Sequence, residues 1–142
     1  FLQAGVGGLA GACAALARQA WGDAPRIIVV EPEVAAALHG SIAAGAPVQS
    51  GGPASQMGRL DCKMPSLIAL KGLARDADCY ALISEAEGAE GAGQAEAAGL
   101  RSTPSGAAGI AALLALTDPD KAALGITAAS VVLCILSEEA EG

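Results

Sequence analysis

Residues 1–11, FLQAGVGGLAG, decide the fold of this chain. The first four residues have the pattern of a strand end, and a helix rich in small residues follows from Leu9. The glycine-rich turn between them directs backbone N–H groups to a helix N-terminus, where they can bind a phosphate group. The sequence therefore predicts a phosphate-binding turn between a strand and a helix. Because only one strand end precedes this turn, we expect the chain to be part of a larger fold.

Strand and helix patterns alternate along the rest of the chain. The apolar, β-branched run at residues 26–31 is typical of a strand buried on both faces of a parallel sheet. Further strands are predicted at 78–83 and 130–136, and helices at 9–20, 32–39, 67–74, 84–99 and 107–116. This alternation predicts an α/β fold of three layers with a mostly parallel sheet, in one domain over residues 1–142.

Two acidic segments are expected to lie in solvent. Residues 84–99 carry glutamates on one side of the predicted helix and three glycines within it, each of which costs about 1 kcal/mol relative to alanine. We therefore expect an exposed and weak helix there. The end of the chain, residues 138–141, is expected to be solvated.

Composition limits the classes of function. Net charge is -7, which argues against nucleic-acid binding, and no apolar run is long enough to cross a membrane. A single histidine, His39, and four widely spaced cysteines argue against a zinc site or a disulfide framework. We expect a cytoplasmic protein with four reduced, mostly buried cysteines: Cys13, Cys62, Cys79 and Cys134.

The glycine turn by itself fits more than one function. Gly5, Gly7 and Ala10 satisfy a dinucleotide-binding pattern, and Glu31 lies at the end of the next strand, where an acid that binds a ribose would lie. Pro32 directly after the acid argues against this interpretation. A tight turn that binds no ligand is the third possibility.

A second motif lies near the C-terminus, at residues 103–109, TPSGAAG. It places the hydroxyl of Ser105 beside small residues at a predicted helix start. Ser105 could serve only as an N-cap. The two motifs in this order, with strands between them, are more specific than either one alone.

Four segments together resemble a known family. GVGGLAG at 5–11, VEPE at 30–33, RLDCKMPS at 59–66 and TPSGAAG at 103–109 are similar to the C-terminal part of fold-type II pyridoxal-phosphate enzymes, the tryptophan synthase β superfamily. The third segment is similar to the diaminopropionate ammonia-lyase subgroup. The resemblance implies pyridoxal phosphate as cofactor, with Ser105 on its pyridine nitrogen. It implies that backbone amides bind the phosphate at Gly5, Val6, Gly7, Gly8 and Leu9.

The resemblance also implies a reaction. A neutral hydroxyl on the ring nitrogen makes the ring a weaker electron sink, which favours β-elimination. The implied reaction converts 2,3-diaminopropionate, a small amino acid, to pyruvate and ammonia, and the full-length protein is implied to be a homodimer. A related dehydratase or synthase stays open. Asp61 and Lys63 are polar candidates near the cofactor, or surface residues, and Glu31 is expected to be structural because Ala37 replaces the second metal-ligating acid of some relatives.

The chain departs from the family pattern in one respect. The family lysine that forms the Schiff base lies upstream of the glycine turn, and no segment here matches it. Lys63, Lys71 and Lys121 lie in other motifs, so no catalytic residue is predicted, and His39 is expected at the surface of a helix end. The remaining hypothesis is a non-catalytic fragment of the same ancestry.

Overall fold

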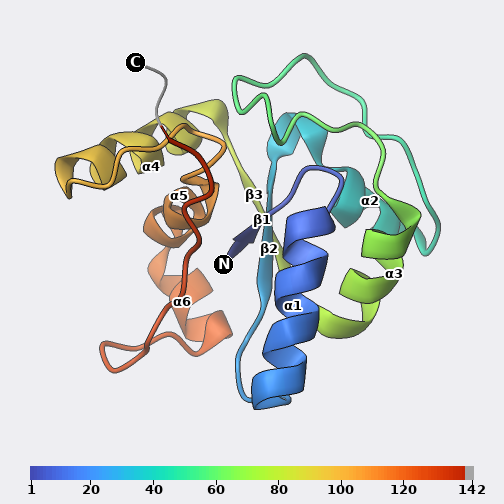
Figure 1. The fold of residues 1–142 in the computed structure, drawn as a ribbon, viewed down its shortest axis with the longest axis horizontal. Coiled ribbons are helices and arrows are strands. Elements are labelled where there is room, and N and C mark those ends of the chain that lie inside the picture. The colour runs from blue at the N-terminus through green and yellow to red at the C-terminus, as the bar shows by residue number, and fades with distance from the viewer. Residues whose placement is uncertain (140–142) are drawn as a thin grey trace.

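A computed structural model describes residues 1–139, in which three parallel strands lie between two layers of helices (Figure 1). The sheet has the order β1 (Leu2–Gln3), β2 (Ile28–Pro32) and β3 (Cys79–Ile83). In the register of the sheet, Val29 of β2 lies between Leu2 and Tyr80. The predicted α/β fold with a parallel sheet is therefore confirmed.

The helices divide between the two faces of the sheet (Figure 1). One layer contains α1 (Gly8–Trp21), α2 (Ala37–Ala44) and α3 (Leu67–Asp76), and the other contains α4 (Glu85–Ala97), α5 (Ala108–Ala115) and α6 (Asp118–Leu124). Alternate residues of β2 fill the two cores: Val29 packs in the first layer, whereas Ile28 and Val30 pack in the second. All five residues of β2 are buried, as its apolar sequence predicts.

The glycines of α4 allow close packing. A Cβ atom at Gly91 would lie 2.5 Å from the Cβ atom of Ala111 in α5, and one at Gly88 would lie 2.9 Å from the sulfur of Met57. One face of α4 is therefore buried, and the expectation of a simply exposed helix is wrong. Ser84 and Glu87 form a capping box that begins this helix.

Two predicted elements differ in the structure. Pro32 is the last residue of β2 rather than the start of a helix, a 3-10 turn follows at Glu33–Ala35, and α2 begins at Ala37. Residues 130–136 form no strand. Single hydrogen bonds connect this segment to the start of the chain: the Phe1 amino group donates to the carbonyl of Leu133 at 2.9 Å.

Helix α6 has no counterpart among the predictions. Its signal is nevertheless local: Thr117 and Asp120 form a capping box, and Pro119 lies in the first turn. The helix is short and has no buried residue, which is why hydrophobic periodicity does not reveal it.

Candidate functional site

The glycine turn joins β1 to α1 at the carboxyl end of the sheet. Gly7 has a φ of +99°, a left-handed conformation that side chains rarely adopt, and α1 begins at Gly8. No side chain caps this helix, and its first turn contains no acid. Within residues 1–139, the amides of residues 8–10 donate to no protein acceptor. These free N–H groups and the helix dipole favour an anion.

The turn packs closely against the segment at residues 59–62. A Cβ atom at Gly5 would lie 2.9 Å from both the carbonyl oxygen of Arg59 and the sulfur of Cys62. The carbonyl of Val6 accepts a hydrogen bond from the amide of Ser66 at 2.9 Å. Only glycine fits at position 5, so the backbone of the turn is held in place while its outer side stays open.

Ser105 precedes α5 and its side chain is almost fully buried. Its Oγ atom accepts a hydrogen bond from the amide of Arg59 at 3.2 Å. The N-cap of α5 is Ala107, so the N-cap interpretation of Ser105 is wrong. Because the accepted bond uses a lone pair, the hydroxyl proton of Ser105 stays free for a further acceptor.

The segment at residues 59–62 brings the two motifs together. Gly5 packs on the carbonyl of Arg59, and Ser105 binds its amide. The side chain of Gln3, at the end of β1, donates to the carbonyl of Gly106 at 3.1 Å. Both motifs therefore lie at the carboxyl end of the parallel strands, where open α/β sheets bind their ligands.

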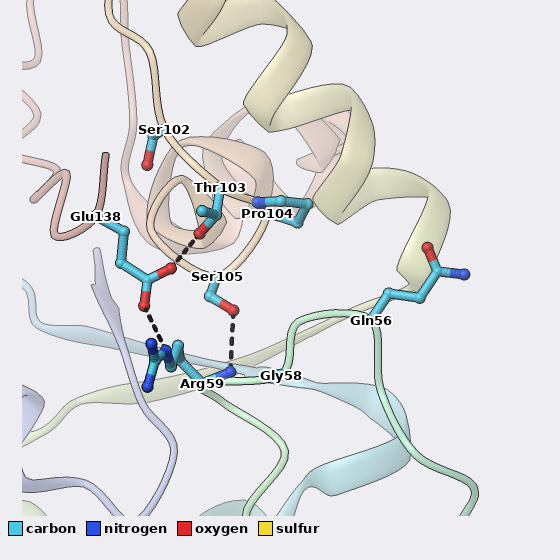
Figure 2. Close-up of a pocket in the computed structure, with 8 residues that line it drawn as sticks. All are labelled: Gln56, Gly58, Arg59, Ser102, Thr103, Pro104, Ser105 and Glu138. Carbon is cyan, nitrogen blue, oxygen red and sulfur yellow. Dashed lines mark hydrogen bonds and ion pairs between the residues drawn. The ribbon is translucent and has the colours of Figure 1, made fainter. Parts of the chain in front are cut away.

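A cavity of about 590 Å³ lies beside the Ser105 hydroxyl (Figure 2). Its volume lies in the range of small-molecule and cofactor sites. It is lined by Gln56, Gly58, Arg59, Ser102, Thr103, Pro104, Ser105 and Glu138. Sequence reasoning missed Arg59 and Glu138 as members of the site. Arg59 belongs to a segment singled out for its resemblance, but no local pattern marks Glu138.

Glu138 also corrects the expectation of a solvated acidic end. Its carboxylate accepts a hydrogen bond from Thr103 and pairs with Arg59 at 3.5 Å, and its side chain is 24% exposed. The side-chain amide of Gln3 holds the segment before Glu138, because it donates to the carbonyl of Ile135 at 2.8 Å. Residues 140 and 141 of the predicted end lie outside the described residues.

Glu31 is completely buried and has a local structural role. Its two carboxylate oxygens accept the amides of Leu38 and His39, each at 2.8 Å, and so cap α2. Burial raises the pKa of Glu31 to about 7, against the lowering effect of the two amide bonds. The carboxylate faces no open site, so the structure does not support a ribose contact. His39 is exposed, as expected.

Asp61 and Lys63 form an ion pair of 2.6 Å next to the long loop before α3. The Lys63 ammonium also donates to the carbonyls of Val34 and Pro53, both at 2.8 Å. The hydrogen bond from Lys63 holds the pKa of Asp61 below its usual range. These contacts connect the loop to the segment after β2, which is a structural role for Lys63.

The substitution Lys63→Met tests this role. It keeps the length of the side chain but removes both hydrogen bonds to the carbonyls, and we expect the free energy of unfolding to fall by about 1–2 kcal/mol. Urea unfolding measures the change. Lys71→Met, at an exposed position of α3, is the matched control and should stay near the wild-type value. Equal stabilities of the two variants would contradict the assignment.

All four cysteines are unpaired and half-buried, so they are less buried than expected. Among residues 1–139, no cluster of three or more His, Cys, Asp or Glu side chains could hold a metal ion. In the same part of the chain, every helix is too short or too polar to cross a membrane.

The fold and the turn define an α/β protein with free backbone amides at a helix start, at the carboxyl end of a parallel strand. The family model described as "Pyridoxal-phosphate dependent enzyme" matches residues 1–138. The chain therefore belongs to this family, and pyridoxal phosphate is its cofactor. None of the curated proteins compared matches the chain.

Solved structures share the fold. Diaminopropionate ammonia lyase from Escherichia coli, in complex with D-serine, is 23% identical with a TM-score of 0.84, over 97% of this chain and 37% of that one. Maize serine racemase is 22% identical with a TM-score of 0.75, over 83% and 36% of the two chains. The processed form of threonine deaminase isoform 2 from Solanum lycopersicum is 22% identical with a TM-score of 0.74, over 79% and 33%. The chain thus spans well under half the length of these proteins.

The residues of the site fit a phosphorylated pyridine. The turn offers free amides without an acid beside them, and Gly5 lacks the Cβ atom that would force the loop away from residues 59–62. Ser105 retains a proton for a ring nitrogen. The donor set therefore suits a phosphate at one end of the ligand and a weakly basic nitrogen at the other.

Proposed function

We propose that this chain supplies the phosphate-binding turn and the ring-nitrogen contact of a pyridoxal-phosphate-dependent ammonia-lyase. The observation that carries the proposal is that both motifs contact Arg59. Gly5 packs against its carbonyl oxygen, and Ser105 accepts a hydrogen bond from its amide. Family membership supplies the cofactor that such a pair of sites can hold. The reaction begins with a β-elimination of ammonia, and overall it converts 2,3-diaminopropionate and one water molecule to pyruvate and two molecules of ammonia.

The residues have separate tasks in this proposal. The amides of residues 5–9 bind the phosphate, and the positive end of the α1 dipole strengthens that contact. The Ser105 hydroxyl orients the ring by a hydrogen bond to its nitrogen. When bound, the cofactor withdraws electrons from the amino-acid α-carbon. A neutral hydroxyl leaves the ring nitrogen without a proton, so electrons are better accepted by a leaving group.

The substrate is chosen by the extent of structural likeness. The likeness to diaminopropionate ammonia lyase extends over 97% of this chain, whereas those to the racemase and the deaminase extend over 83% and 79%. In a full-length enzyme that supplies the Schiff-base lysine, release of pyruvate from 2,3-diaminopropionate, compared with release of 2-oxobutyrate from threonine and pyruvate from serine, tests this choice. Faster elimination from threonine or serine would reassign the substrate.

Ser105→Ala tests the ring contact without requiring a Schiff base. Deoxypyridoxine phosphate, in which a methyl group replaces the aldehyde, should bind about fivefold to tenfold more weakly, because a hydrogen bond is worth about 1 kcal/mol. Isothermal titration calorimetry measures the dissociation constant.

Ser102→Ala is the matched control for that experiment. Ser102 lines the same cavity, and its buried hydroxyl has no hydrogen-bond partner within residues 1–139. Its removal should leave the dissociation constant nearly unchanged. Equal affinities of the two alanine variants would remove the role of Ser105, and an absence of saturable binding to the unmodified chain would overturn the proposed function.

A further inference from the structure

Two charged side chains line the cavity beside Ser105, and they pair with each other. The Nε atom of Arg59 lies 3.5 Å from a carboxylate oxygen of Glu138, and the other six lining residues are uncharged. Figure 2 shows the Ser105 hydroxyl bonded to the Arg59 backbone amide, and the charged pair lines the same cavity. A further acid that contacts the lining loop, Glu85, is already bound to the side chain of Ser55 and the amide of Gln56.

The two members of the pair are held very differently. Glu138 is only 24% exposed, and its second oxygen accepts a hydrogen bond from Thr103. Its backbone packs on Gly106, where an added Cβ atom would lie 3.0 Å from the Glu138 nitrogen and Cβ. The Arg59 side chain is 80% exposed and meets Glu138 only through one nitrogen. The carboxylate of Glu138 is thus held in the cavity, whereas the guanidinium of Arg59 lies largely in solvent.

This arrangement bears on the ring nitrogen, and the inference rests on the proposed function. We propose that Arg59 neutralises Glu138 so that the nitrogen held by Ser105 stays unprotonated. A carboxylate without its partner would attract a proton to that nitrogen. Arg59 and Glu138 are therefore positioning residues for the electronic state of the ring rather than groups that react.

The physical effect has a definite sign. A negative charge within a few ångströms of the ring nitrogen favours its protonated form. The positive charge of Arg59 opposes this effect of Glu138, although solvent around Arg59 weakens that opposition. Loss of Arg59 should raise the pKa of the bound ring nitrogen by about 0.5–1 pH unit. Loss of Glu138 should lower that pKa by a larger amount, because its carboxylate is only 24% exposed whereas the Arg59 side chain is 80% exposed.

A double-mutant cycle on the protein loaded with deoxypyridoxine phosphate tests the proposal. The ring-nitrogen NMR shift, followed against pH, is measured for wild type, Arg59→Gln, Glu138→Gln and the double variant. Arg59→Gln keeps the backbone amide that binds Ser105, so only the charge changes. We expect a raised pKa in Arg59→Gln, a return toward wild type in the double variant, and a wild-type value in Arg59→Lys.

Each outcome bears on one claim. An unchanged ring pKa in Arg59→Gln, or the same value in Arg59→Gln and the double variant, would overturn the inference while leaving the binding site intact. Failure of the analogue to bind wild type would instead overturn the proposed function and the inference with it. Far-ultraviolet circular dichroism checks that the variants fold. If Arg59→Gln does not fold, Glu138→Gln gives the test, because an unchanged ring pKa in that variant would also overturn the inference.

Discussion

Gly8→Asp is expected to remove most of the affinity for the phosphorylated ring without weakening the fold. A side chain at Gly8 meets no atom within 4 Å, and the residue is the first of α1. An acid in the first turn stabilises a helix by about 0.3–1 kcal/mol, but it repels a phosphate bound at the same amides. We expect a loss of at least about 2 kcal/mol in binding, or roughly thirtyfold in Kd.

The control for this prediction is Gly8→Ala. It adds the same Cβ atom without a charge and should bind deoxypyridoxine phosphate nearly as tightly as wild type. Calorimetry gives the affinities, and urea unfolding without ligand gives the stabilities. In Gly8→Asp the affinity should fall while the stability does not, so the loss of binding can be assigned to charge repulsion rather than to misfolding. If Gly8→Asp and Gly8→Ala bind alike, the phosphate does not lie at the start of α1.

Glu31→Gln is expected to remove a large dependence of stability on pH. Burial raises the pKa of Glu31 to about 7 from an ordinary value of 4.5, so the folded protein holds its proton more tightly than the unfolded chain. The stabilisation is complete below pH 4.5 and is lost as pH rises to about 7. The full change amounts to about 3 kcal/mol.

Urea unfolding at several pH values measures this effect. In wild type, the contribution of Glu31 makes the free energy of unfolding fall between pH 4.5 and 7. Glu31→Gln should lack this component, although it loses part of the cap on α2 at every pH. Glu33→Gln, at an exposed position two residues away, is the control and should retain the wild-type slope. Parallel slopes in wild type and Glu31→Gln would refute the prediction.

Local patterns predicted the elements that depend on nearby residues. Helix α1, strand β2 and helix α3 follow from apolar spacing, glycine placement and the Ser66 cap, which act within a few positions. The strand predicted at residues 130–136 fails for the opposite reason. This segment meets the start of the chain through single hydrogen bonds rather than a ladder, and such contacts depend on residues more than a hundred positions away.

The sequence motifs predict only part of the candidate site. The glycine turn and Ser105 are visible in the sequence because each combines a special residue with a helix start. The pair Arg59 and Glu138 is not, because an ion pair between distant positions has no sequence period. Glu31 is structural, as expected from the sequence, but no local pattern shows that it caps the following helix.

The sequence by itself determined the alternation of strands and helices and the glycine turn at the start of α1, since hydrophobic period and glycine conformation act locally. Only the tertiary structure decided that Gly5 and Ser105 both contact Arg59, and that Glu138 lines the cavity beside Ser105. These contacts join segments far apart along the chain. They depend on how both helical layers pack on the sheet, and no local preference specifies them.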